Sequence, residues 1–355
     1  MDRSKTGLPL PRRSVLAGAA GLATTPLMAP AAQAASRCVV GTWGGDYANL
    51  LRENIDQPIL QPDGITVVQA VSDEAPRVAQ LFAKRMLPHG TMDIACLSSF
   101  NGYRAATAGL IATLDTTKVP NLKHVNPELH SGSFMPGQFV PHIYSAQVFA
   151  YNPATVKTPP RTWTELLHPR WKGRIGVQTN AAVWVMMGAA QAVGGNPDAV
   201  DKAKEYLLKL NANGIRLYPE TDDFAPAFKS GEIDVGIIWQ ARTVMWKNAG
   251  FPVKGQYPDE GAILYVSGMV MPKNAPDKEA AYKYMNALLE PSAQQGFAAH
   301  MGYRPTVTNA ELTGEIAEDL ALPQGVKLVQ PDYPVIAKAT PDLTDWWLKN
   351  IQRKS

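Results

Sequence analysis

Runs of consecutive apolar residues alternate along this chain with segments in which apolar residues recur every three or four positions. The apolar runs predict buried β-strands, and the periodic segments predict amphipathic helices. In the first part of the chain, strands are expected at residues 38–43, 65–71 and 92–98, and helices at 47–55, 76–85 and 100–108. This β-α-β-α-β order predicts a parallel sheet with helices on both faces.

A second series of the same kind begins at residue 174. Strands are expected at 174–179 and 232–240, and helices at 184–192 and 198–211. The second of these helices follows Asn196-Pro197, which is a signal for a helix start. Further helices are expected at 278–290 and, in the Pro-rich C-terminal part, at 344–352. The chain is therefore predicted to be α/β.

Two long extended runs, 142–152 and 262–272, flank this second series. A chain that leaves one lobe, builds another and returns needs two crossing segments, and two crossings form a hinge. About 320 residues follow position 34, a length that suits two domains better than one. We therefore expect the following division: 35–143 plus 266–310 as lobe 1, 144–265 as lobe 2, and 311–355 as a C-terminal segment that packs back across the lobes.

Residues 1–34 have the organisation of an export signal. Arg12-Arg13 precedes an apolar, small-residue run at 15–32, and Ala32-Gln33-Ala34 provides the small-x-small pattern that signal peptidase cleaves. The run is too short and too rich in Gly and Pro for a membrane-spanning helix. The paired arginines resemble the twin-arginine export motif, and an ordinary Sec signal is the alternative. We therefore expect a periplasmic or secreted protein that begins near Ala35.

Charge and composition exclude several classes of function. The formal net charge is +3 and both charge signs are mixed along the chain, so nothing indicates nucleic-acid binding. The histidines are scattered, without the spacing of a metal site. The chain also lacks the Gly-x-Ser-x-Gly, P-loop and His-Glu-x-x-His motifs. We therefore expect no cofactor, no metal and no catalytic residue.

The two cysteines, Cys38 and Cys96, fall on the first and third expected strands. If these strands are parallel neighbours, the cysteines are offset by about four residues, or roughly 13 Å. That is beyond the reach of a disulfide, so two buried free thiols are expected. Cys38 also follows no lipobox, which argues against a lipid anchor.

Several segments resemble one known protein family. They are GTWGGDY (41–47), PRTWTELLHPRWKGRI (160–175), FKSGEIDVGIIWQ (228–240), EGAILYVSGMVMPKNAP (260–276) and MNALLEPSAQQGFAAHMGYRPT (285–306). In this order they are similar to extracellular solute-binding proteins of the spermidine/putrescine type. The resemblance implies a type II periplasmic-binding fold, with two α/β lobes, two crossover strands and a ligand cleft between them. It also implies a monomeric component of an ABC importer, with a small-molecule ligand and a membrane permease as partners.

The resemblance and the geometry of parallel sheets together predict the ligand site. Ligands of open parallel sheets lie beyond the carboxyl ends of the strands, which is where Thr42 stands. The positions that match the family's cleft are Trp43, Tyr47, Trp239 and Tyr265, together with Ser98, Ser99 and Phe100 in the loop after the third strand. For each aromatic residue, packing within a lobe is the alternative role.

The chain departs from the family where polyamine binders carry acidic residues. Those places read QTNAAV (178–183) and YVSG (265–268), with Asn180 and Ser267 but no Asp or Glu. An ammonium group buried without a carboxylate partner costs several kcal/mol, of the order of 3–5. Asp222 is a candidate carboxylate, and Arg242 and Arg304 could bind a ligand's carboxylate or phosphate. We therefore expect a neutral, zwitterionic or anionic ligand of amino-acid-like or carboxylate type, and a polyamine held by other carboxylates stays open.

Two other classes of protein share this fold. Thiamine-cleaving enzymes resemble these binders and need a cleft cysteine, for which Cys96 is the candidate, although its apolar neighbours favour a core position. A sensor subunit that presents its ligand to a membrane receptor would have the same fold and cleft. We expect a binding protein rather than an enzyme, in which a ligand that contacts both lobes only in the closed form drives closure.

Overall fold

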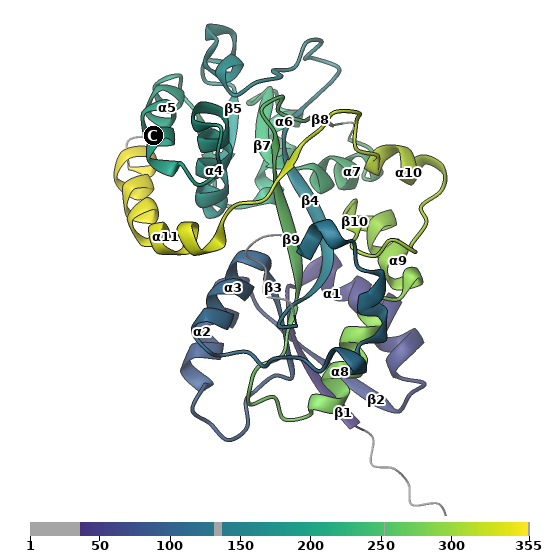
Figure 1. Cartoon of the computed structure of the whole chain (residues 1–355). Coiled ribbons are helices and arrows are strands. Elements are labelled where there is room, and N and C mark those ends of the chain that lie inside the picture. Colours follow the sequence, from purple (N-terminus) through teal and green to yellow (C-terminus); the bar gives the residue numbers. More distant parts are fainter. Residues whose placement is uncertain (1–35, 131–136, 252, 354–355) are drawn as a thin grey trace, which may run out of the picture. The chain divides into compact units, whose positions relative to one another are not determined.

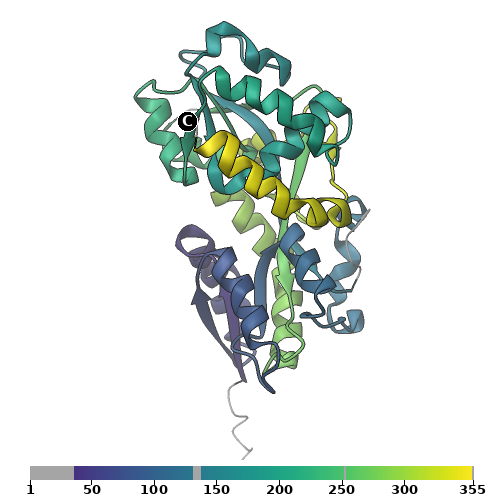
Figure 2. The same cartoon turned by 90° about the vertical axis from the view of Figure 1, so that its left-hand side faces the viewer.

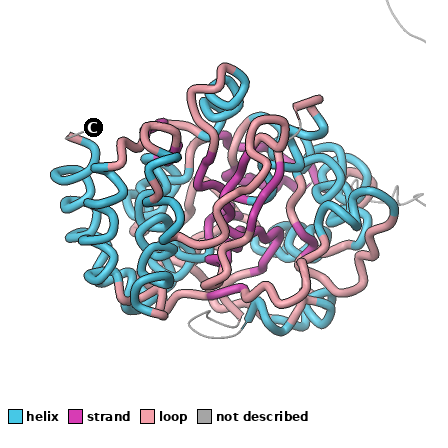
Figure 3. The backbone as a smooth tube through the Cα atoms, turned by 90° about the horizontal axis from the view of Figure 1, so that it is seen from above, coloured by secondary structure: helices cyan, strands magenta, loops and turns pink. Residues whose placement is uncertain are grey.

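The computed structural model describes residues 36–130, 137–251 and 253–353 (Figure 1). The predicted export signal lies outside these residues. Within them, no helix is long and apolar enough to cross a bilayer. Seen from above in Figure 3, the strands lie between groups of helices. The fold is the mixed α/β, two-lobed arrangement expected from the sequence.

Lobe 1 is built on three parallel strands in the order β2-β1-β3. They are β1 (Ser36–Thr42), β2 (Ile65–Val71) and β3 (Ile94–Ser98), each within two residues of its predicted bounds. The connecting helices are α1 (Gly45–Leu51), its continuation η1 (Arg52–Leu60), α2 (Glu74–Lys84) and α3 (Ser99–Thr107). The hydroxyl of Ser98 caps α3 by accepting a hydrogen bond from Asn101 N at 3.4 Å. The carboxyl end of each of these strands therefore lies next to the start of a helix.

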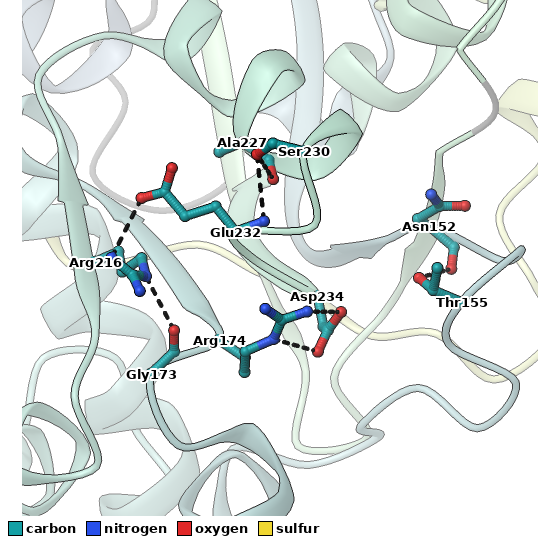
Figure 4. Close-up of polar contacts among 9 residues, drawn as sticks. All are labelled: Asn152, Thr155, Gly173, Arg174, Arg216, Ala227, Ser230, Glu232 and Asp234. Carbon is teal, nitrogen blue, oxygen red and sulfur yellow. Dashed lines mark hydrogen bonds and ion pairs between the residues drawn. The ribbon is translucent and has the colours of Figure 1, made fainter.

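Lobe 2 repeats this arrangement with the parallel order β7-β5-β6. Its strands are β5 (Ile175–Gln178), β6 (Arg216–Tyr218) and β7 (Val235–Trp239), and its helices are α4 (Ala182–Gly194), α5 (Val200–Ala212), α6 (Phe224–Lys229) and α7 (Gln240–Asn248). The amino ends of the strands are joined by ion pairs, as Figure 4 shows. Arg174 binds Asp234 through two hydrogen bonds of 2.8 and 2.9 Å, and Arg216 lies 3.4 Å from Glu232. These contacts hold the amino ends of the three strands together. The candidate residues lie at the opposite, carboxyl ends.

Two long strands join the lobes, as the sequence predicts. β4 (Val140–Tyr151) and β9 (Ala262–Val270) pair antiparallel with each other, with Val140 opposite Met269 and Ala146 opposite Leu264. The far end of β4 pairs with β7, and the far end of β9 pairs with β3. Both sheets and both crossings thus form one continuous strand order, β2-β1-β3-β9-β4-β7-β5-β6.

The segment after β9 first completes lobe 1 and then returns to lobe 2. Its elements are α8 (Lys278–Leu288), α9 (Pro291–Met301), β10 (Arg304–Pro305), α10 (Gly314–Leu320), β11 (Leu328–Val329) and α11 (Tyr333–Trp347), the last drawn in yellow in Figure 2. The helix predicted at 344–352 is present, as the end of α11 and its continuation η9 (Leu348–Gln352), but α11 begins eleven residues earlier than predicted and contains Pro341. A proline usually ends a helix, but packing against neighbouring helices retains this one.

Both cysteines lie in the core of lobe 1 and are free. The register that places Gly41 opposite Ala95 puts Cys96 four residues along from Cys38, as expected. Neither thiol is exposed, and burial raises the pKa of Cys38 and raises that of Cys96 to about 11. A thiol in this state is a poor nucleophile, so Cys96 does not support a cysteine enzyme.

Candidate functional site

A large cleft, of about 860 Å³, lies where the strands of both lobes end. That volume suits a small organic ligand. Its lining comes from the loops after β1 and β2, the first turns of α3, α4 and α7, the crossing strands and the end of α9. The lining residues are Trp43, Gly44, Gly45, Asp46, Tyr47, Asp73, Glu74, Ala75, Pro76, Asn101, Ile143, Gln178, Asn180, Ala181, Trp184, Glu220, Asp222, Trp239, Arg242, Met245, Tyr265, Ser267, Met301 and Tyr303.

Three aromatic rings form the wall on the side of lobe 2. Trp239 ends β7, Trp184 lies in the first turn of α4, and Tyr265 comes from the crossing strand β9. Their ring centroids are 5.4 Å apart for Trp184–Trp239, 5.7 Å for Trp184–Tyr265 and 4.7 Å for Trp239–Tyr265. Each ring therefore holds the others in place, and the group presents a rigid apolar face to the cleft.

The wall on the side of lobe 1 contains a second aromatic pair. Trp43 and Tyr47 meet edge to face at 5.0 Å. The Tyr47 hydroxyl lies 2.8 Å from His142 Nδ1, and its ring packs edge to face on Phe297 at 5.2 Å. His142 sits at the irregularity in the pairing of β4 with β9, and burial lowers its pKa to about 3. A neutral histidine on the hinge strand thus fixes the orientation of Tyr47.

A buried arginine supports the same wall from behind. The guanidinium carbon of Arg77 lies 4.7 Å from the centre of the Trp43 ring, and the side chain is 1% exposed. Its Nε and Nη1 donate to Cys96 O at 2.8 Å and Ser72 O at 2.7 Å. Gly41 makes room for its stem, since a Cβ there would be 2.8 Å from Arg77 Cδ. The face of Trp43 is therefore held by a cation–π contact.

Charged groups surround the aromatic walls. Five lining residues carry carboxylates, namely Asp46, Asp73, Glu74, Glu220 and Asp222, whereas Arg242 is the one cation among the described lining residues. Arg242 Nη1 lies 3.7 Å from Asp222, and Glu220 accepts a hydrogen bond from Asn180 Nδ2 at 3.3 Å. Glu74 accepts a hydrogen bond from the backbone N–H of Ser98. The cleft therefore offers more negative than positive charge.

The structure places eight of the predicted site residues along this cleft. They are Trp43, Tyr47, Asn180, Asp222, Trp239, Arg242, Tyr265 and Ser267. Thr42, Ser98, Ser99, Phe100 and Arg304 are buried and are not among its lining residues.

The displaced candidates have other partners. The Ser99 hydroxyl lies 2.6 Å from the hydroxyl of Tyr333 in α11, and the Phe100 ring packs near the same tyrosine at 6.1 Å. Arg304 donates to Leu320 O and to the Tyr257 hydroxyl, each at 2.7 Å. Ser99 and Phe100 therefore contact the C-terminal segment, and the hydrogen bonds of Arg304 go to other buried groups. Arg304 was expected as a ligand-binding residue, but these hydrogen bonds hold it in the interior and it is not among the lining residues.

Sequence reasoning missed most of the carboxylates. Asp46 and Asp73 follow the carboxyl ends of β1 and β2 by a few residues, so the rule that selected Trp43 would also have found them. Glu220 follows β6, a three-residue strand that the apolar pattern did not predict. Trp184 lay within a predicted helix, and nothing local distinguished it from a core residue. Within the described chain, no group of three or more His, Cys, Asp or Glu side chains could hold a metal ion.

Comparisons with known proteins agree with this architecture. The model of a family described as bacterial extracellular solute-binding protein matches residues 64–324. The chain is 29% identical over 262 residues to the spermidine/putrescine-binding periplasmic protein of Salmonella typhimurium, covering 70% of this chain and 72% of the relative. It is 27% identical over 258 residues to a putative 2-aminoethylphosphonate-binding periplasmic protein of Salmonella typhi, covering 68% and 71%.

Among solved structures, a spermidine/putrescine ABC transporter substrate-binding protein of Streptococcus pneumoniae superposes with a TM-score of 0.70. The two chains are 21% identical, and the match covers 90% of this chain and 100% of the other. This similarity establishes the fold.

Proposed function

Since the chain belongs to the bacterial extracellular solute-binding proteins, and is a binding protein of an ABC transporter rather than an enzyme, we propose that its ligand is a short zwitterionic amine. Such a ligand has an ammonium group at one end, an acidic group at the other and an aliphatic chain between them. One observation carries the proposal: among the described residues, an aromatic-lined cleft has carboxylates on both walls and one guanidinium, Arg242, on the wall of lobe 2.

Arg242 is the partner for the acidic end of the ligand. It lies in the first turn of α7, where the free N–H groups of the helix start add positive potential. Its side chain is 23% exposed, whereas that of its neighbour Asp222 is 89% exposed. A solvated carboxylate at 3.7 Å is a weak competitor. Arg242 can therefore exchange that contact for a bidentate bond to a ligand carboxylate or phosphonate.

The carboxylates of lobe 1 are the partners for the ammonium end. Asp46 lies in the first turn of α1 and Asp73 immediately precedes α2, and both are exposed to the cleft. A ligand whose acidic end binds lobe 2 and whose ammonium end binds lobe 1 gains both contacts only when the lobes approach each other. Its differential affinity for the closed form then drives closure.

The aromatic walls suit the aliphatic part of the ligand. Trp43 on one side and the group formed by Trp184, Trp239 and Tyr265 on the other offer flat apolar faces. Burying a methylene group between them contributes about 0.8 kcal/mol. The same faces attract an ammonium group by cation–π interaction, which is strongest for Trp.

The names of the relatives supply independent support. One is named for spermidine and putrescine, and another for 2-aminoethylphosphonate. These compounds share a primary ammonium group on a short aliphatic chain, and the last also carries an acidic group.

A diamine is the second candidate, because carboxylates outnumber cations in the cleft. In that case the aromatic wall on the side of lobe 2, with Glu220 and Asp222, would bind one ammonium group. Asp46 and Asp73 of lobe 1 would bind the other. Arg242 would then oppose binding unless it stayed paired with Asp222.

Isothermal titration with three four-carbon solutes separates these candidates. 4-Aminobutyrate, putrescine and succinate have the same chain length and differ only in whether their ends are mixed, both cationic or both anionic. We expect 4-aminobutyrate to bind at least about tenfold more tightly than either other solute, a difference of about 1.4 kcal/mol. Tightest binding of putrescine would establish the diamine, and tightest binding of succinate would refute both candidates.

The remaining expectations belong to the same proposal. Residues 1–34 are removed on export, by the twin-arginine or the Sec route, and the mature chain acts as a periplasmic monomer. The lobes comprise 35–143 plus 266–310, and 144–265, with 311–355 packed across them. The closed form docks on a membrane permease. The relatives' names and the absence of a membrane-spanning helix among the described residues support this location.

A further inference from the structure

The C-terminal helix α11 is attached to lobe 2 along most of its length. β11, which precedes it, pairs with the beginning of β9 at Ala262. The backbone N–H of Asp332 donates to Asp198 Oδ1 at 2.8 Å, next to α5. The helix packs on α4, and its Trp347 is buried. α11 therefore moves as part of lobe 2.

Its first residue, Tyr333, belongs instead to an interface with lobe 1. The side chain is fully buried, and its hydroxyl lies 2.6 Å from the Ser99 hydroxyl at the start of α3. Its ring lies 6.1 Å from those of Phe100 and Tyr103, both in α3. Burial raises the pKa of Tyr333 to about 12, so the hydroxyl stays protonated at neutral pH and can donate. Tyr333, which lobe 2 carries, thus adds a buried hydrogen bond to the packing of α11 on α3 of lobe 1.

Helix α3 lies between this contact and the ligand cleft. Asn101 lines the cleft, whereas Ser99, Phe100 and Tyr103 do not and meet Tyr333 instead. A rotation that brings the two cleft walls together around the hinge moves the opposite face of α3 away from α11. The Tyr333 contact and a closed cleft therefore compete.

In the form described, a cleft of about 860 Å³ lies between the walls of the two lobes. The ring contact Trp43–Tyr47 belongs to the wall of lobe 1, and the contacts Trp184–Trp239 and Trp239–Tyr265 belong to the wall of lobe 2. The aromatic contacts of each wall stay within that wall. The Tyr333–Ser99 bond is thus a contact of the open form.

We propose that Tyr333 is an interlobe latch that stabilises the open form and thereby lowers the apparent affinity for the ligand. A buried hydrogen bond between neutral groups shifts an equilibrium about two- to tenfold. When the open form dominates, removing a contact found only there lowers the apparent Kd by the same factor. The inference rests on the lobe closure that is part of the proposed function, but not on the identity of the ligand.

Two substitutions remove the bond from either side. Tyr333→Phe keeps the ring among its aromatic neighbours, and Ser99→Ala removes only the partner hydroxyl. Tyr284→Phe is the matched control, because its hydroxyl donates to Asp56 within lobe 1 at 3.0 Å and is equally buried. Each variant is compared with the parent chain by titration with 4-aminobutyrate, putrescine and succinate, and by its unfolding midpoint in urea.

A second measurement needs no ligand. Spin labels at Glu53→Cys and Lys229→Cys, exposed positions on the two lobes, report the interlobe distance in the free protein. The native cysteines are buried and are not labelled in the folded state.

We expect Tyr333→Phe and Ser99→Ala each to lower the Kd of the solute that binds by about two- to tenfold, with no further gain in the double variant. The free-protein distances should shift toward shorter values in both, and Tyr284→Phe should change neither quantity. Unchanged distances in both folded variants would overturn the latch, as would a raised Kd. If no solute of the panel binds, the proposed ligand fails while the distance measurement still decides the latch.

Discussion

Replacing Arg242 by Gln tests the proposed ligand most directly, because the charge of this one residue acts in opposite senses on the two ligand candidates. Gln keeps an N–H donor group on a shorter side chain but removes the positive charge. Arg242 is the one cation among the described residues of the cleft, so no neighbour there compensates for its loss. A zwitterion should lose affinity, and a diamine should gain it.

The magnitude follows from the burial of the site. Two charges 4 Å apart interact with about 4 kcal/mol at an effective dielectric constant of about 20. Part of that is offset by the desolvation of Arg242, whose side chain is 23% exposed, and by the loss of its contact with Asp222. A net of about 1.5–3 kcal/mol is typical of a hydrogen bond to a charged group. We therefore expect Kd for 4-aminobutyrate to rise about 10- to 150-fold.

The assay is titration of Arg242→Gln against 4-aminobutyrate and putrescine, with Arg216→Gln as the control. Arg216 also belongs to lobe 2 and pairs with a carboxylate, Glu232, but at the amino end of the sheet (Figure 4). Arg216→Gln removes the same charge without touching the cleft, so long-range effects of net charge cancel. An Arg242→Gln protein that binds 4-aminobutyrate as tightly as the parent would refute the role of this residue.

Three further predictions concern the wall on the side of lobe 1. His142 has a folded-state pKa of about 3 against an ordinary value of 6.5, so the unfolded chain binds the proton more readily and stability falls as pH drops below 6.5. The free energy of unfolding should decrease by about 2 kcal/mol between pH 7 and pH 5 from this group, and His142→Phe should remove that part of the slope in urea titrations. Gly41→Ala should cost about 1–3 kcal/mol of stability, measured in the same way, because its Cβ would meet Arg77 Cδ at 2.8 Å and Met92 Sδ at 2.9 Å; an unchanged midpoint would show that Arg77 can move. Iodoacetamide should leave Cys96 unlabelled until the chain unfolds, and rapid labelling of folded protein would reopen the enzyme hypothesis.

The regular parts of the fold could be predicted because burial imposes a period on the sequence. The strands β1, β2 and β3 and the crossings β4 and β9 were found within two residues, since each is an apolar run bounded by polar segments. β6 and α6 are too short to show a period.

The first part of the C-terminal helix, before residue 344, escaped prediction for a different reason. Pro341 lies inside α11, and local rules read it as a break. Packing against α4 and α3 overrides that local preference. Tertiary contacts of this kind are not visible in a single segment.

The candidate site was predictable to the extent that strand ends determine it. Trp43 and Trp239 follow from that rule. Tyr303 and Arg304 are sequence neighbours, yet Tyr303 lines the cleft and Arg304 is bonded to Tyr257 instead. The local pattern does not say which of the two enters the cleft. Apart from Asp222, acidic residues were sought only where polyamine binders carry them, and the structure places the other cleft carboxylates at other strand ends.

The strand order also determines when each lobe can be completed during synthesis. Lobe 2 is a continuous stretch inserted between β4 and β9, so its parallel strands β5, β6 and β7 are all available once β7 has been made. Lobe 1 begins the chain, yet its core includes Tyr284, Leu288 and Phe297 from α8 and α9. The core of lobe 1, whose strands are synthesised first, can therefore be completed only after some three hundred residues have been translated. Its apolar strands stay uncovered until then. This half meanwhile exposes apolar surface of the kind that makes partly folded chains prone to aggregation.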